Sequence, residues 1–386
     1  MTDTIYFDNN ATTKVAEEVL KEIKPFYCEL YGNPSSMHTF GGQIGSKIRN
    51  AREQVAALLG CDPVEIIFTS GGTESDNTAI KGALAANTNR TRIITSRVEH
   101  PAVLTVCREL ENHGYTIVEV GVDKNGRLDM TQLAEQIDET TALVTIMYAN
   151  NETGTIFPID EISKMAVEKN VIFHTDAVQA VGKIPLNLAQ SHIDLLSLSG
   201  HKLHAPKGVG ILYVRKGTRL SPFMLGGHQE AGRRAGTENV PGIVGLGKAC
   251  ELAAKNIEQE NKRVKSLRDK LENAILKSCP DCMVNGDTKN RLPNTSNISF
   301  EYIEGESILL MLDQFGICAS SGSACTSGSL EPSHVLRAMG VPFTAAHGSI
   351  RFSLSRYTTE KEIDYTIEKL PPIITRLRQL SPFVTE

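Results

Sequence analysis

Two charged residues follow apolar runs of the strand type and could do chemistry together. Asp176 comes shortly after the run 171–174, and Lys202 closes Ser199-Gly-His-Lys202 after the run 194–198. The ligand site of an open α/β sheet lies beyond the carboxyl ends of its strands, so both side chains are predicted at one edge. Pyridoxal phosphate (PLP) needs a lysine amine and a carboxylate for its pyridine nitrogen. The pair predicts a PLP site, with an ordinary solvated lysine as the alternative.

A glycine-rich turn offers a place for the phosphate of such a cofactor. Ser70-Gly-Gly-Thr-Glu-Ser75 follows the apolar run 65–69 and leads into an expected helix. The unpaired N–H groups and the dipole of a helix N-terminus favour an anion. An ordinary turn with a helix cap would look the same, so this motif gains weight only beside Lys202 and Asp176.

One cysteine lies in a stretch that does not resemble core. Cys325 stands in Ser320-Ser-Gly-Ser-Ala-Cys-Thr-Ser-Gly328, whose serine and glycine content is typical of a mobile surface loop. A thiolate is the nucleophilic form of cysteine, and a mobile one could carry a bound group outward. The alternative is a buried, inert cysteine. Cys318 is the nearest rival, but its neighbours are those of an apolar strand.

The elements that position these residues alternate along the chain. Strand-like apolar runs recur with helical segments such as 101–114 and 159–170 between them. Alternating strands and helices predict an α/β fold with a mainly parallel sheet covered on both faces. Gly208 to Val214 predicts a further strand, which could be an antiparallel neighbour. The predicted strands of this sheet are 65–69, 92–95, 142–147, 171–174, 194–198 and 208–214.

The chain is long enough for two domains. We predict a large domain over residues 14–255 and a small α+β domain formed by residues 1–13 and 256–386. A charged amphipathic helix over 253–277 would connect them. The small domain would carry the Cys325 loop, at about 320–333. Its expected strands are 297–300, 316–318 and 349–353, and its expected helices are 305–312 and 360–380.

Composition excludes several classes of function. A net charge of −5 with scattered Lys and Arg gives no basic surface for nucleic acid. The N-terminus lacks the pattern of a signal peptide, and no apolar run has the length of a membrane span, which predicts a cytoplasmic protein with no membrane partner. Eight irregularly spaced cysteines predict no disulfide framework. Cys279 and Cys282 are interpreted as a turn, and no intrinsic metal site is expected.

Ordered motifs along almost the whole chain give a resemblance. The sequence resembles the cysteine desulfurases of the aminotransferase class V group, within the PLP enzymes of fold type I. Their large domain has a sheet of the seven-stranded type. The matching motifs are Asp8-Asn-Asn-Ala-Thr-Thr13, Gly32-Asn-Pro-Ser-Ser36, Gly71-Gly-Thr-Glu74, Glu99-His100, Asn150-Asn-Glu-Thr-Gly154, His174-Thr-Asp-Ala-Val-Gln179, Ser199-Gly-His-Lys202, Arg234-Ala-Gly-Thr-Glu238 and Ser320-Ser-Gly-Ser-Ala-Cys325.

The resemblance implies roles for individual residues. Lys202 would hold PLP, Asp176 would pair with the pyridine nitrogen, and His100 would stack on the ring and move protons. Gln179 and Asn151 would bond the phenolic oxygen and neighbouring substrate atoms. Arg351 would clamp the substrate carboxylate, with Asn33 assisting. The implied phosphate site comprises Gly72, Thr73, Ser199, His201 and, from the second subunit of a homodimer, Thr237.

The resemblance also implies a reaction. L-Cysteine would become L-alanine, and its sulfur would pass to Cys325 as a persulfide for an iron-sulfur scaffold protein. The uninterrupted loop is closest to the NifS branch, associated with nitrogenase maturation, more than to the housekeeping IscS branch. Cys325 could also bind a transient iron-sulfur cluster. Two alternatives stay open: selenocysteine lysis or another PLP reaction, and a non-enzymatic sulfur carrier or scaffold.

Overall fold

Seven strands form the central sheet of the protein, for which a computed structural model describes residues 4–321 and 331–382. The strand order is β2-β8-β7-β6-β5-β3-β4. All neighbours are parallel except β8, which runs antiparallel to both β2 and β7. The predicted mainly parallel sheet with an antiparallel β8 is therefore confirmed. The strands are β2 (Ile66–Thr69), β3 (Arg92–Ser96), β4 (Thr116–Val120), β5 (Thr141–Thr145), β6 (Ile172–Asp176), β7 (Leu195–Ser199) and β8 (Gly210–Val214).

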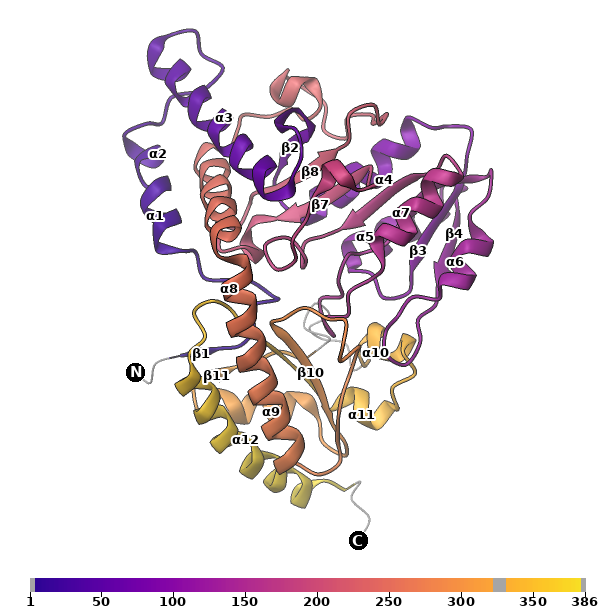
Figure 1. Cartoon of the computed structure of the whole chain (residues 1–386), viewed down its shortest axis with the longest axis vertical. Helices are drawn as coiled ribbons and strands as arrows, with labels where there is room; N and C mark the ends of the chain where they lie inside the picture. Colours follow the sequence, from indigo (N-terminus) through magenta and orange to yellow (C-terminus); the bar gives the residue numbers. More distant parts are fainter. Residues whose placement is uncertain (1–3, 322–330, 383–386) are drawn as a thin grey trace.

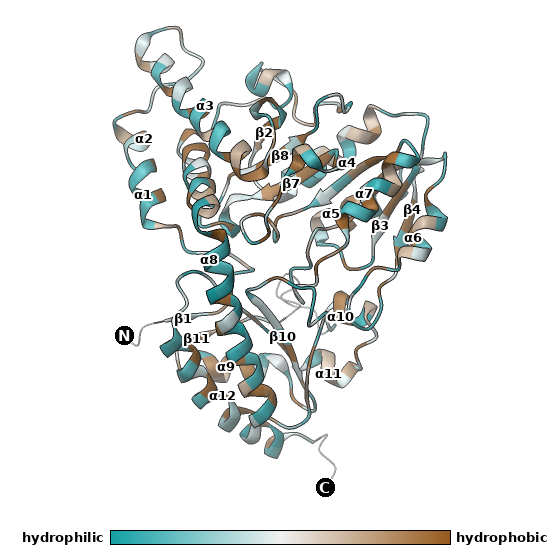
Figure 2. Ribbon diagram, viewed as in Figure 1, coloured by the Kyte–Doolittle hydropathy of each residue, from teal (hydrophilic) through white to brown (hydrophobic). Residues whose placement is uncertain are grey.

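Helices cover both faces of this sheet. Successive side chains of a strand point to opposite faces, so apolar neighbours in one strand are buried on both sides. Ile66 and Phe68 of β2 belong to one buried cluster, whereas Ile67 between them belongs to another. The first cluster includes side chains of α3, α6, α7 and α8, and the second includes those of α4 and α5. Figure 2 shows the apolar strands between these layers. The helices on this sheet are α3 (Thr39–Leu59), α4 (Gly72–Ala85), α5 (Pro101–Glu111), α6 (Met130–Gln136), α7 (Ile159–Glu168) and α8 (Val240–Ser278), with α1 (Glu17–Ile23) and α2 (Pro25–Cys28) at the edge.

The long helix α8 extends from the first body into a second one (Figure 1). It begins at Val240, well before the predicted start at 253, because tertiary packing overrides the poor helix propensity of its glycines. A Cβ at Gly247 would lie 2.6 Å from the Cα of Ala51, so glycine permits the close approach of α8 to α3. The last turns of α8 bury Leu271 and Ile275 in a separate cluster.

The second body contains a three-stranded sheet, β12-β10-β9, a two-stranded sheet, β1-β11, and both ends of the described chain (Figure 1). Its cluster combines Phe7 with side chains of α8, α9, α12 and the strands. Residues 5–7 therefore pack with the C-terminal part, as expected. The division into domains at 14 and 255 stays a prediction, and α10 packs into the first cluster through Val335 and Leu336. The elements are β1 (Ile5–Tyr6), β9 (Cys282–Val284), β10 (Thr295–Phe300), α9 (Gly305–Asp313), β11 (Ile317–Cys318), α10 (His334–Ala338), α11 (Phe343–His347), β12 (Ser349–Ser353) and α12 (Glu360–Leu380).

The described residues contain no membrane-spanning helix, no metal-ligand cluster and no disulfide. None of the helices in the described ranges has both the length and the apolarity to cross a membrane. Within the same ranges, no group of three or more His, Cys, Asp or Glu side chains could hold a metal ion. The cysteines there are all free thiols, including Cys279 and Cys282.

Candidate active site

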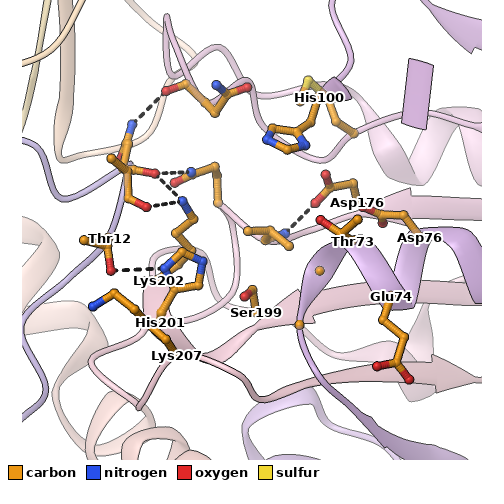
Figure 3. Close-up of a pocket in the computed structure, with 18 of the residues that line it drawn as sticks. Thr12, Thr73, Glu74, Asp76, His100, Asp176, Ser199, His201, Lys202 and Lys207 are labelled. Atoms are coloured by element: carbon orange, nitrogen blue, oxygen red, sulfur yellow. Dashed lines mark hydrogen bonds between the residues drawn. The ribbon is translucent and has the colours of Figure 1, made fainter. Parts of the chain in front are cut away.

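A cavity of about 520 Å³ opens where the strands of the large sheet end. Asp176 is the last residue of β6 and Ser199 the last of β7, and both line the cavity. Figure 3 shows His100, Asp176 and Lys202 around this space. Ten predicted site residues meet here: Gly72, Thr73, His100, Asn151, Asp176, Gln179, Ser199, His201, Lys202 and Arg351.

The N-terminus of α4 forms one wall of the cavity. Its N-cap is Gly71, at φ 152°, which has no side chain to bond the first amides of the helix. A Cβ on Gly210 of the neighbouring strand would lie 2.7 Å from the Cα of Gly71, so the turn is held close to the sheet. Open amides at Gly72 and Thr73 suit a phosphate group.

His201 and Ser199 face the same wall. Burial and the charges of Lys202 and Lys207 lower the pKa of His201 to about 4, so its imidazole is neutral near pH 7. Its Nδ1 is hydrogen-bonded to Thr12 Oγ1 at 3.1 Å (Figure 3). Its other ring nitrogen can bond a ligand, as the Ser199 hydroxyl can.

Lys202 is held by the N-terminal segment. It lies in a 3₁₀ turn, Gly200–Lys202, which follows β7. Its Nζ donates to the carbonyl oxygens of Asn10 and Ala11 at 2.6 and 2.7 Å. These bonds orient the amine toward the cavity that Lys202 lines. The motif 8–13 therefore has a positioning task that sequence reasoning did not assign to it.

Asp176 has a second buried carboxyl beside it. Burial raises the pKa of Asp176, while the charges of His100 and Lys202 and the amide of Val178 lower it. The pKa of Asp76, on α4, is raised well above its usual range, first by burial and then by the charge of Asp176. Two adjacent carboxylates resist being ionised together. We therefore assign the negative charge to Asp176 and the proton to Asp76.

Substitutions at these two carboxyls test that assignment. Asn resembles a protonated Asp in shape and charge, so Asp76→Asn is expected to change cysteine turnover by less than about threefold. Asp176→Asn removes a charge that the site uses and is expected to lower turnover about 10- to 100-fold. Initial rates of alanine formation measure both. Equal losses in the two variants would contradict the assignment.

His174 lies close to Asp76, with Nε2 3.6 Å from Oδ1 of the carboxyl. Its buried imidazole is expected to make the stability of the protein depend on pH. Burial lowers its pKa to about 3, whereas the unfolded chain has the usual 6.5. Below pH 6.5 the unfolded chain therefore binds a proton that the folded one excludes, and stability falls as the pH drops. Between pH 7 and 5 this group is expected to remove about 2 kcal/mol from the free energy of unfolding. Urea titrations of wild type and His174→Gln should differ by that amount in their pH dependence; parallel curves would refute the prediction.

His100 begins α5 and faces the cavity at the same time. Its Nδ1 accepts the N–H of Ala102 at 3.1 Å, as an N-cap does. The proton of the neutral ring is therefore on Nε2. Burial lowers the pKa of His100, which keeps the ring neutral near pH 7. His100 therefore caps the helix expected over 101–114 and lines the cavity at the same time.

Glu99 precedes His100 in the chain and is fully buried. Burial raises the pKa of Glu99 to about 8. Its Oε1 accepts from Ser96 Oγ at 2.6 Å and from the amide of Met147 at 2.9 Å. Sequence reasoning assigned Glu99 no task, although the residue stands in a matched motif. The structure connects it to the ends of β3 and β5.

Arg351 reaches the cavity from the small sheet. It lies on β12, and its side chain is 4% exposed. One amino group donates to the carbonyl of Asn151 at 3.0 Å, and the other pairs with Asp8 at 2.8 Å. The predicted strand position is confirmed. A guanidinium held on two sides presents a fixed fork to a carboxylate.

Two predicted residues do not line the cavity of this chain. Asn33 is exposed, and its side chain accepts the amide of Ser35 at 2.9 Å. Thr237 is exposed as well. Arg234, three residues before Thr237, pairs through Nε with Glu74 of α4 at 2.8 Å. This ion pair connects the segment of Thr237 to the phosphate-binding helix, and sequence reasoning missed it.

Cys325 lies outside the described residues. Ser320 and Ser333, which come before and after residues 322–330, both make hydrogen bonds close to the candidate site. Ser320 and Arg351 exchange backbone hydrogen bonds, with Arg351 N to Ser320 O at 2.7 Å. Ser333, the N-cap of α10, donates to the buried carboxyl of Glu152, next to Asn151. Ser320 therefore contacts Arg351 itself, and Ser333 contacts the residue next to Asn151, whose carbonyl Arg351 binds.

Comparisons with known proteins agree with this geometry. Residues 5–366 match the family described as "Aminotransferase class-V". The chain belongs to this family. A relative from Trichormus azollae, named "Cysteine desulfurase", is 65% identical over 98% of this chain and 95% of its own length. "Cysteine desulfurase NifS" of Azotobacter vinelandii is 58% identical over 98% of this chain and 94% of its own length.

Solved structures give the same result for the fold. A protein titled "NIFS-LIKE PROTEIN" superposes with a TM-score of 0.91 at 41% identity, covering 97% of this chain and all 100% of that chain. The structure "SspA in complex with cysteine" has a TM-score of 0.82 at 37% identity and covers 92% of this chain and 100% of its own. The predicted fold class and the resemblance to the NifS group are confirmed.

Proposed function

We propose that this protein is a cysteine desulfurase that converts L-cysteine to L-alanine and transfers the sulfur to Cys325 as a persulfide. One observation carries the proposal: Lys202, Asp176, His100 and Arg351 meet around a single cavity at the N-terminus of α4. The 65% identity to a relative named "Cysteine desulfurase" supports the reaction.

The cavity fits PLP as the cofactor. Its donors for a phosphate are the first amides of α4 with Ser199 and His201, and Lys202 and Asp176 supply the amine and the carboxylate. When bound, PLP supplies a ring that withdraws electrons from the substrate α-carbon. Asp176 would face the pyridine nitrogen, and Gln179 and Asn151 would bond polar atoms at the ring edge and on the substrate.

The side chains around the cavity have distinct tasks. Arg351 binds the substrate carboxylate through its fork, which fixes the orientation of the α-carbon. The amine of Lys202 would hold the cofactor and, in its free form, would remove the α-proton of the substrate. The Nε2–H of neutral His100 can donate a hydrogen bond to the substrate, and the ring can return a proton to the substrate carbon after it has first accepted one.

Sulfur transfer requires a nucleophile from outside the cavity wall. The Cys325 thiolate attacks the sulfur of cysteine and forms an S–S bond, while the C–S bond breaks. The bonding pair stays with carbon, which takes a proton and becomes the methyl group of alanine. The persulfide remains on Cys325. Ser320 is hydrogen-bonded to Arg351, which lines the cavity, and Ser333 is hydrogen-bonded to Glu152, so these described residues support the proposal from either side of Cys325 in the sequence.

Partners and location belong to the same proposal. The exposed apolar side chains of Met37 and Leu225 suit a homodimer, in which Thr237 would reach the phosphate site of the partner and Asn33 would assist Arg351. The persulfide sulfur would go to an iron-sulfur scaffold protein. The name of the Azotobacter relative supports nitrogenase maturation as the destination. We also infer a cytoplasmic location.

Product analysis tests the proposed reaction. The protein is reconstituted with PLP, mixed with L-cysteine and a thiol reductant, and assayed for alanine and sulfide. Equal amounts of the two products are expected. Pyruvate in place of alanine would indicate elimination, and alanine formation from selenocysteine alone would indicate a selenocysteine lyase; either result would overturn the proposal.

A further inference from the structure

A lysine outside the predicted site is connected to it through one side chain. Lys183 lies in the turn after β6, and its Nζ donates to both oxygens of Gln179: the backbone O at 3.2 Å and Oε1 at 3.0 Å. Gln179 is 5% exposed and lines the cofactor cavity. We infer that Lys183 is a positioning residue whose ammonium group holds the Gln179 amide with its NH₂ group toward the cofactor. This inference rests on the proposed function.

The orientation follows from the donors and acceptors on each side of Gln179. The Lys183 amine donates hydrogen bonds in both its charged and its neutral form, and the amide oxygen is the side-chain group of Gln179 that can accept them. A carbonyl can only accept, and the carbonyl of Asn10 accepts from Nε2 of Gln179 at 3.0 Å. The NH₂ group has a second hydrogen, which it can donate to a ligand in the cavity. Without Lys183, the buried Oε1 would lose its donor, and the amide could rotate toward another one.

The backbone around Lys183 is fixed for this contact. Gly182 has a φ of 76°, and a Cβ there would lie 2.0 Å from Cδ1 of Leu203, which directly follows Lys202. The carbonyl of Lys183 accepts from Asn261 of α8 at 2.7 Å. The turn is therefore packed between the Lys202 segment and α8, and its positive φ and the close Leu203 side chain favour glycine at position 182.

Among the described residues, Lys183 forms no ion pair with a carboxylate of the small cavity that it lines. Glu260 of α8 lines the same small cavity as Lys183 but binds Arg356, with Nε to Oε1 at 3.0 Å. Burial, with the positive charges of Lys202 and Arg351, lowers the pKa of Lys183 to about 7. A buried lysine usually has an acidic partner, whereas in the described residues the hydrogen bonds of this ammonium both go to Gln179. Its position is explained by that amide.

A double-mutant cycle on PLP affinity tests the inference. PLP is titrated into apo-protein of wild type, Lys183→Met, Gln179→Met and the double variant. Lys183→Met is expected to weaken binding about 3- to 10-fold, the loss of one hydrogen bond. If Lys183 acts through Gln179, the double variant binds within about twofold of Gln179→Met alone. Wild-type affinity in Lys183→Met, or losses that multiply in the double variant, would overturn the inference.

A second variant and a second readout guard against a folding defect. Lys183→Gln keeps an NH₂ donor without the charge and is expected to bind PLP within about twofold of wild type, with a wild-type visible circular dichroism of the bound cofactor. A loss as large as in Lys183→Met would mean that charge or packing, not donation, is the cause, and would overturn the inference. If wild-type protein itself binds no PLP, the proposed function fails instead.

Discussion

Replacing Lys202 with alanine is expected to lower cysteine turnover at least about 10³-fold, because one amine both holds the cofactor and moves the α-proton. The geometry behind this expectation is the pair of hydrogen bonds from Nζ to Asn10 and Ala11, which hold the amine at the cavity. Alanine formation is measured with the PLP-loaded protein. Borohydride treatment followed by peptide mass should place the cofactor on Lys202 in wild type and on no lysine in the variant.

Lys207 provides the matched control. It also lines the cavity, so it is the lysine most able to replace Lys202 by proximity. In Lys207→Ala the borohydride adduct should remain on Lys202. An adduct on Lys207 or Lys183 in the wild-type protein would show that the wrong amine has been assigned.

Replacing Cys325 with alanine is expected to lower sulfide release at least about 10²-fold while the bound cofactor keeps its visible absorption. Lys202 and Asp176 are unchanged in this variant, so cofactor binding and α-proton exchange should continue. After incubation with L-cysteine, peptide mass should find one added sulfur on the Cys325 peptide of wild type only. Undiminished sulfide release would show that another group accepts the sulfur.

Cys318→Ala is the matched control, because Cys318 is the nearest rival to Cys325 in the sequence and its thiol has a raised pKa. Cys318 lies on β11, and burial with the charges of Asp313 and Asp8 raises its pKa. Burial also raises the pKa of Cys61 and of Cys107 to about 12. Such thiols are poor nucleophiles near pH 7. Cys318→Ala should therefore release sulfide at a rate within about twofold of wild type, and a large loss would favour the rival position.

Local pattern predicted the places of Lys202 and Asp176, whereas their roles were implied by the resemblance to the cysteine desulfurases. Asp176 ends β6 and Lys202 comes shortly after β7, and strand ends can be predicted from a short apolar run and the polar residues after it. In a parallel sheet those ends share one edge, so the position of the cavity followed from the order of elements. The helix start at His100 was equally local, because its cap bond reaches only to Ala102.

Other contacts depend on residues far apart in the chain. The pairing of Arg351 with Asp8 and the hydrogen bond from Lys183 to Gln179 need a folded backbone to bring the groups together. The early start of α8 also depended on packing, since its glycines disfavour a helix until α3 lies against them.

The sequence by itself determined the fold class, and it predicted the edge of the sheet and the reactive residue types of the candidate site, because strand periodicity and residue type are local properties. Only the tertiary structure showed which carboxyl has its pKa raised well above the usual range, which carbonyls accept from Lys202, and which lysine is hydrogen-bonded to Gln179. Burial sets the first, through the cost of charge in a dry interior. Packing of distant segments sets the other two.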